Sequence, residues 1–261
     1  MTATELDFTP APAAAPQIQQ LLAQTRMELR LLLRNGEQLL LTIVIPTLLL
    51  LVFTKAPIAD LPKPRVSFLL PGVLALAVMS TAFTGQAIAT GFERRYGVLR
   101  RLGTTALPRS SLLAGKTAAV IVVELLQVAL LIVVGLALGW SPRGNAAEVV
   151  ALLLLGTVAF SSLGLLMAGT LRAEATLAAA NLVYLLLLVL GGVAFPLTDF
   201  GAGTRHVLEL LPIAALSDGV RHALQSVAGH RSAAVPLHDW VTLMVWAVAG
   251  SVLASRLFRW Q

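Results

Sequence analysis

Cysteine is absent from the 261-residue chain, and charged side chains are scarce. The lack of cysteine excludes disulfide bonds, thiolate zinc sites and a cysteine nucleophile. Charged residues make up 12% of the chain, against roughly 25% in soluble domains. Hydrophobic residues make up 57%, and the mean hydropathy is +0.84. This composition is typical of a polytopic membrane protein. The net charge of +6 lies at the ends of apolar segments, so we expect contact with membrane lipid and no nucleic-acid partner.

Six apolar segments approach the roughly 20 residues that a membrane-spanning helix needs. They predict an all-α integral membrane domain over residues 17–261, with spans at about 37–59, 68–89, 117–140, 149–171, 175–197 and 240–255. Pro46 lies inside the first span, where a neighbouring helix can satisfy the carbonyl that proline leaves free. Gly135 and Gly139 in the third span have the spacing that allows close helix contacts, as at a dimer face.

Two different segments precede the first span. Residues 1–16 are rich in Ala and Pro and predict a disordered tail. They contain no Lys or Arg, unlike a signal peptide, so we expect the spans themselves to direct insertion. Residues 17–35 show a helical period, with Ile18, Leu21, Leu22, Leu29, Leu32 and Leu33 on one face and Arg26, Arg30 and Arg34 along an adjacent one. This pattern favours a helix at the membrane interface, with a bundle helix as the alternative.

Residues 198–239 form a segment too long for a simple turn and too apolar for a solvated loop. Residues 200–211 and 214–227 predict two short helices broken at Pro212, and neither is long enough to cross the bilayer. We expect both to be re-entrant and to cap the outer half of a pathway, because such helix ends must be covered by protein or water. All four histidines lie in or beside this segment at spacings that match no standard metal motif, so we predict no metal site; an external pH or metal role is the alternative.

The loop between the second and third spans carries six of the 19 basic residues: Arg94, Arg95, Arg100, Arg101, Arg109 and Lys116. Basic residues in short loops stay on the cytoplasmic side. With six spans, the side that holds this loop and both termini has 12 Lys and Arg, against seven on the other side. Both termini are therefore predicted to be cytoplasmic.

The same loop has the spacing of a short amphipathic helix that ends at Pro108. Its apolar and small positions are Gly97, Leu99, Leu102, Thr105 and Leu107, and the arginines surround them. A basic helix with a few apolar side chains can dock into a groove on a soluble partner.

Two polar residues, Glu124 and Gln127, lie well inside the third span. An intramembrane ionisable group is by default a candidate for a substrate pathway or a proton relay. The alternative is a side chain that faces the bundle interior and pairs with a neighbouring hydroxyl or amide. Gly115-Lys116-Thr117 resembles the end of a phosphate-binding loop, but Ser110 stands where that motif needs glycine. We therefore expect no nucleotide site and no catalytic residues in this chain.

The order of these parts resembles the membrane-spanning subunits of type-2 (ABC-2 type) ABC exporters over about residues 17–259. The central loop carries the resemblance through Glu93-Arg94, Gly97, Leu99, Leu102, the turn Thr105-Ala106-Leu107-Pro108-Arg109 and Gly115-Lys116. The chain departs from the family pattern at two positions: Ala106 replaces a common proline, and Arg100 replaces an acidic residue that many members carry. Both differences bear on the fit to a particular ATPase. The arginine-rich loop is most similar to that of daunorubicin-resistance-type drug-efflux permeases.

The resemblance implies a permease of the bacterial plasma membrane with an interfacial helix, six spans, a coupling helix between spans two and three, and two re-entrant helices before span six. It implies pairing with an identical or related permease and with two copies of a separate cytoplasmic ATPase that binds ATP and Mg. This chain would bind no cofactor and would not be an enzyme. The expected cargo is amphipathic, drug-like or lipid-like, or a polysaccharide. The alternative is a proton- or ion-coupled secondary transporter that uses Glu124. The absence of an internal sequence repeat in this chain weakens that alternative, because such repeats are common in secondary transporters.

Overall fold

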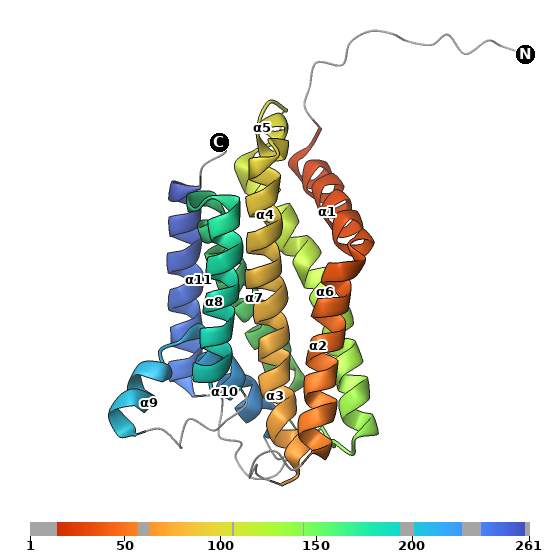
Figure 1. Ribbon diagram of the computed structural model, residues 1–261, viewed down its shortest axis with the longest axis vertical. Helices are drawn as coiled ribbons and strands as arrows, with labels where there is room; N and C mark the ends of the chain where they lie inside the picture. Colours follow the sequence, from red (N-terminus) through yellow and green to blue (C-terminus); the bar gives the residue numbers. More distant parts are fainter. Residues whose placement is uncertain are drawn as a thin grey trace, which may run out of the picture.

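The computed structural model describes residues 15–56, 63–105, 107–142, 144–193, 201–225 and 236–258, and these are helical apart from short turns. Most of the helices run side by side along the long axis of the molecule (Figure 1). In chain order they are α1 (Gln17–Arg34), α2 (Gly36–Lys55), α3 (Arg65–Val78), the π-helix η1 (Met79–Gly85), α4 (Gln86–Arg95), α5 (Val98–Leu102), α6 (Arg109–Ala137), α7 (Ala146–Thr170), α8 (Ala173–Leu190), α9 (Ala202–Leu208), α10 (Pro212–Gln225) and α11 (Leu237–Leu257).

Five helical segments within the described residues are long and apolar enough to cross a membrane. They are Arg65–Arg95, Ser110–Ala137, Ala146–Thr170, Ala173–Leu190 and Leu237–Leu257. The apolar stretch Thr42–Lys55 of α2 is shorter. Large apolar side chains of these segments, such as Leu126, Leu182 and Val245, are exposed, as expected of helices that face lipid. The chain is therefore a multi-pass membrane protein.

The helices do not end where the predicted spans do. The helix that contains the third predicted span begins at Arg109, ahead of residue 117, because Pro108 is extended and the helix starts directly after it. The helix of the second span runs from Arg65 to Arg95 without a break, well beyond residues 68–89. The helix of the fifth span ends at Leu190 rather than at residue 197; two glycines follow it, and Gly192 has a φ of +67°.

The two glycines of the third span have different surroundings in the fold. A Cβ on Gly135 would lie 3.1 Å from Leu70 of α3, so this glycine permits a contact within the chain. Gly139 lies beyond the end of α6 with a φ of +88°. It turns the chain back after α6, and the Trp140 side chain that follows is buried.

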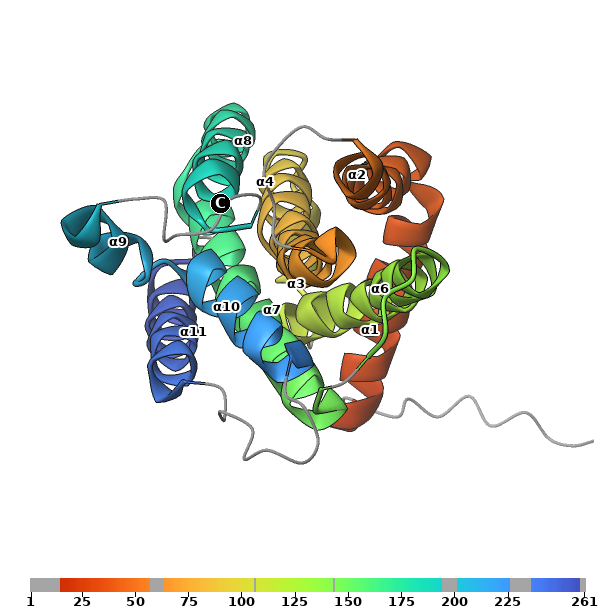
Figure 2. The same cartoon turned by 90° about the horizontal axis from the view of Figure 1, so that it is seen from below.

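The centre of the bundle is built from α3, η1 and α7, which other helices surround (Figure 2). Small residues bring these helices together: a Cβ on Gly164 of α7 would lie 2.8 Å from the carbonyl oxygen of Phe83 in η1. A π-helical turn inside a long helix is frequent at functional sites. Here it sits midway along the Arg65–Arg95 segment.

Two short helices lie at the end of the bundle opposite α5 (Figure 1). The break predicted at Pro212 is confirmed, because α10 begins at that residue, a position that suits proline. α10 packs across α3, α7 and α11 through buried side chains such as Ile213 and Leu216, whereas α9 projects from the side of the bundle (Figures 1 and 2).

Candidate functional site

The connection between α4 and α6 forms the end of the molecule at which α1 begins and α11 ends (Figure 1). Gly97 has a φ of +71° and separates α4 from α5. Such a backbone conformation favours glycine over residues with a Cβ. Glu93, Arg94 and Arg95 belong to the last turn of α4 rather than to a separate helix, and α5 ends at Leu102, before the predicted end at Pro108.

The leucines of this connection pack against the protein's own long helices. Leu99 is fully buried against Leu112 of α6, Leu165 of α7, and Ala254 and Phe258 at the end of α11. Leu102 and Leu107 pack partly buried against the same cluster, which we call the leucine anchor. Leu99 is therefore used for packing inside this chain. A five-residue helix cannot hold itself in place, and burial of Leu99 fixes α5 to three long helices.

The exposed side of the connection is polar and basic. Arg100, Arg101, Thr104 and Thr105 are exposed, and the Tyr96 side chain is 65% exposed. We call these five residues the basic tip. Tyrosine and arginine are enriched among the residues that dominate binding energy at protein interfaces. Sequence reasoning missed Tyr96, although an aromatic residue between arginine pairs was a visible signal. The side chain of Arg109 lies outside the described part of the chain.

Lys116 does not belong to the exposed surface. Its ammonium group is buried, 2.9 Å from Oε1 of Glu28 in α1 and 2.5 Å from Oε2 of Glu93 in α4. Gln24 donates a hydrogen bond to Glu28 at 2.7 Å. This ion cluster of Glu28, Glu93 and Lys116 joins three helices, and removal of one partner from a buried pair costs about 3–5 kcal/mol. Sequence reasoning missed Glu28 and Gln24.

The resemblance of Gly115-Lys116 to a phosphate-binding loop has a packing explanation. Both residues lie within α6, and a Cβ on Gly115 would lie 2.7 Å from Cγ of Gln24. Gly115 therefore lets α1 approach α6 closely, and Lys116 pairs with the acid that this approach brings near.

Polar residues of α1 are buried where this helix packs on α6. Gln24 and Glu28 are buried, whereas Ile18, Leu22 and Leu33 are exposed. The predicted arginine face, formed by Arg26, Arg30 and Arg34, is exposed as well.

Two arginines tie the end of α4 to the turn between α7 and α8. Arg94 donates a hydrogen bond to the carbonyl of Leu171, and Arg95 pairs with Glu174. A cavity of about 380 Å³ lies between these groups and is also lined by Arg172.

Glu124 and Gln127 are both buried in the bundle, as the interior alternative expected. Glu124 accepts a hydrogen bond from the Thr157 hydroxyl of α7 at 2.5 Å. Gln127 donates to the Thr42 carbonyl of α2 at 2.5 Å and accepts from the Thr81 hydroxyl of η1 at 3.2 Å. Thr42 is the residue whose carbonyl loses its helical partner to Pro46. The prediction that a neighbouring helix satisfies this carbonyl is confirmed.

The fold and this polar, tethered end define a multi-pass helical membrane protein in which the connection between α4 and α6 is basic and exposed. The family model for ABC-2 type transporters matches residues 19–224. The chain therefore belongs to the ABC-2 type transporter family. Membership supports a permease subunit of an ABC transporter. Permeases of this family are generally non-catalytic, and the family implies a partnership with an ATP-binding subunit. No curated protein matches the sequence significantly.

Proposed function

We propose that the chain is the permease of an ATP-driven exporter and that its basic tip docks on the ATPase subunit. The observation that carries this proposal is the contrast between neighbours in α5: Leu99 is fully buried, whereas Arg100 and Arg101 are exposed. A short helix that packs on three spans through its buried side and is charged on its exposed side is suited to transfer force from a soluble partner to the spans.

Movement of α5 would reach the spans by two routes. The leucine anchor connects it to α6, α7 and α11. The ion cluster connects the end of α4 to α1 and α6, and α4 continues through η1 into α3 as one long helix. ATP binding that draws the two ATPases together would therefore shift the second span and α1 together and open an outward path.

The proposed topology has six spans, with α2 as the first and both termini on the cytoplasmic side of a bacterial plasma membrane. The excess of Lys and Arg on the side of α5 supports this orientation. α1 would lie at the interface, which its exposed leucines and arginines suit. α9 and α10 would be re-entrant at the outer face, and the packing of α10 across the opposite end of the bundle supports that role.

The proposed cargo is an amphipathic drug-like or lipid-like molecule, with a polysaccharide as the alternative within the family. The apolar helices favour such a cargo over an ion. The assembly would contain a second permease, identical or related, and two ATPase copies that bind ATP and Mg. Family membership does not favour a secondary transporter.

Charge reversal at the basic tip tests this function. The double variant Arg100→Glu, Arg101→Glu should insert normally but lose its ATPase during purification, because the other cytoplasmic charges still direct topology. The matched double variant with lysine at both positions keeps the charge and should retain most of the ATPase. Equal ATPase recovery with both variants would refute docking through the basic tip.

A further inference from the structure

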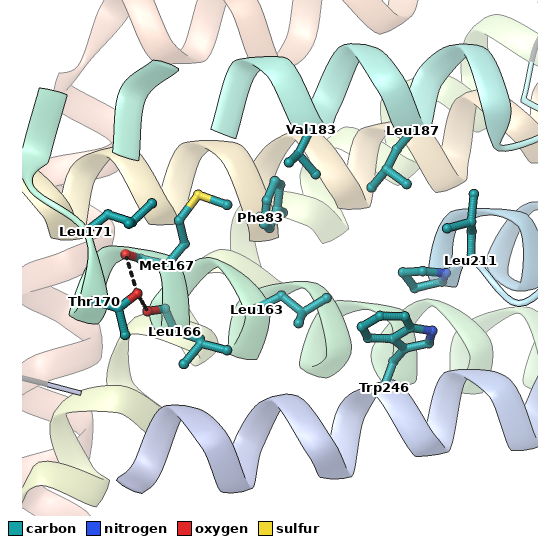
Figure 3. A pocket seen from close by; sticks show the side chains of 11 residues that line it. Phe83, Leu163, Leu166, Met167, Thr170, Leu171, Val183, Leu187, Leu211 and Trp246 are labelled. Atoms are coloured by element: carbon teal, nitrogen blue, oxygen red, sulfur yellow. Dashed lines mark hydrogen bonds between the residues drawn. The ribbon is translucent and has the colours of Figure 1, made fainter. Parts of the chain in front are cut away.

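An apolar groove of about 430 Å³ opens between α7, α8 and α11 (Figure 3). Leu163 and Met167 of α7 face Val183 and Leu187 of α8 across it, and Trp246 of α11 lies toward one end. The volume is within the range of sites for small ligands, roughly 300–1,000 Å³.

The groove offers no hydrogen bond to a polar ligand along most of its length. Its lining includes one hydroxyl, that of Thr170, which donates to the carbonyls of Leu166 and Met167 in its own helix. A polar group placed there would lose its hydrogen bonds to water without replacement. The groove therefore suits a hydrocarbon chain.

One end of the groove adjoins the basic cavity between α4 and the turn from α7 to α8. Leu171 lines the groove, and its carbonyl accepts a hydrogen bond from Arg94, which lines the cavity together with Arg172. Arg95 and Glu174, also in the cavity lining, pair with each other. The cavity therefore has a net positive charge beside the open end of a hydrocarbon-shaped groove.

We propose that these two spaces form one binding site for an anionic phospholipid, with an acyl chain in the groove and the phosphate in the basic cavity. Basic pockets between membrane helices on the cytoplasmic side bind anionic lipid headgroups. The inference rests on the proposed orientation, because that orientation places the cavity at the level of the cytoplasmic headgroups. The ligand class is a glycerophospholipid with a net negative headgroup, such as phosphatidylglycerol.

Quenching of Trp246 fluorescence tests the site directly, because this side chain lines the groove. The full chain is reconstituted in phosphatidylcholine nanodiscs that contain a small fraction of either phosphatidylglycerol or phosphatidylcholine with brominated acyl chains. The signal of Trp246 is the difference between the parent chain and Trp246→Phe. We expect brominated phosphatidylglycerol to quench it at a lower lipid fraction than brominated phosphatidylcholine does.

Two variants and one control locate the ligand. Arg172→Gln should lower the preference for phosphatidylglycerol by about fivefold, the effect of one basic residue near an anionic lipid. Val183→Phe should fill the groove and reduce quenching by the bound lipid. Arg256→Gln removes an exposed arginine at the same end of the bundle but outside the cavity, and the preference should remain. All variants are first shown to be monodisperse by gel filtration.

Equal quenching by the two lipids, or an unchanged preference in Arg172→Gln, would overturn the proposal. The assay needs no ATPase, so its failure is distinct from failure of the exporter function. If Arg172→Gln abolishes the lipid preference but the parent chain never binds an ATPase, the lipid site is supported and the exporter function is refuted. If the parent chain binds its ATPase but shows no lipid preference, the exporter function is supported and the lipid site is refuted.

Discussion

Replacement of Gln127 by leucine should destabilise the chain, because it leaves the Thr42 carbonyl without a donor. Pro46 has no N–H, so the carbonyl four residues earlier has no partner in α2. Nε2 of Gln127 supplies the missing hydrogen bond at 2.5 Å. A buried unsatisfied group costs about 1–3 kcal/mol, and hydrogen bonds between membrane helices contribute up to about 2 kcal/mol. We expect a loss of about 1–2 kcal/mol, which lowers Tm by about 2–8 °C in a chain of this size.

A double-mutant cycle separates this bond from general packing. Pro46→Ala restores the backbone donor, so Gln127→Leu should cost less in the Pro46→Ala background than in the parent. Thr81→Val removes the other hydrogen bond of Gln127, and its cost should not depend on residue 46. Thermal unfolding of detergent-solubilised protein provides the readout. An equal cost of Gln127→Leu in both backgrounds would refute the reasoning.

Three further variants test other contacts. Lys116→Met leaves the buried carboxylates of Glu28 and Glu93 without their cation, so we expect about 3–5 kcal/mol of destabilisation. The additional change Glu93→Gln should recover part of this loss, and no recovery would contradict the ion cluster. Gly164→Ala should lower Tm because its Cβ would meet the Phe83 carbonyl oxygen at 2.8 Å, whereas Gly36→Ala meets nothing within 4 Å and is the control. Glu124→Gln can still accept from Thr157, so transport and its pH profile in proteoliposomes should not change; a lost pH dependence would favour proton coupling.

Sequence patterns predicted the elements of the fold better than their contacts. Apolar runs located the long helices, and the residues of the central loop indicated the family. The chemistry of Pro46 also predicted that its freed carbonyl would find a partner, because that requirement is local to the residue. The identity of the partner, Gln127, depends on how α6 packs against α2, and spacing along the chain does not reveal it.

The errors in the candidate site have the same origin. The period of Leu99 and Leu102 indicates an apolar face but not what covers that face, and the chain's own spans cover it. On α1, the leucine pattern did not show which residues meet α6, and Gln24 and Glu28 are buried in that contact. Gln24 and Glu28 are four residues apart and therefore lie on one face of the helix. That spacing was the available signal for a buried acid opposite Lys116.

Purification of the tagged chain from membranes, followed by identification of bound subunits by mass spectrometry, tests the central claim most directly. The account predicts an ATP-binding subunit in stoichiometric amount, retained by the parent chain and lost when Arg100 and Arg101 are reversed in charge. The same sample would show whether the second permease is identical or related. A chain that purifies alone and transports in vesicles without ATP would contradict the account.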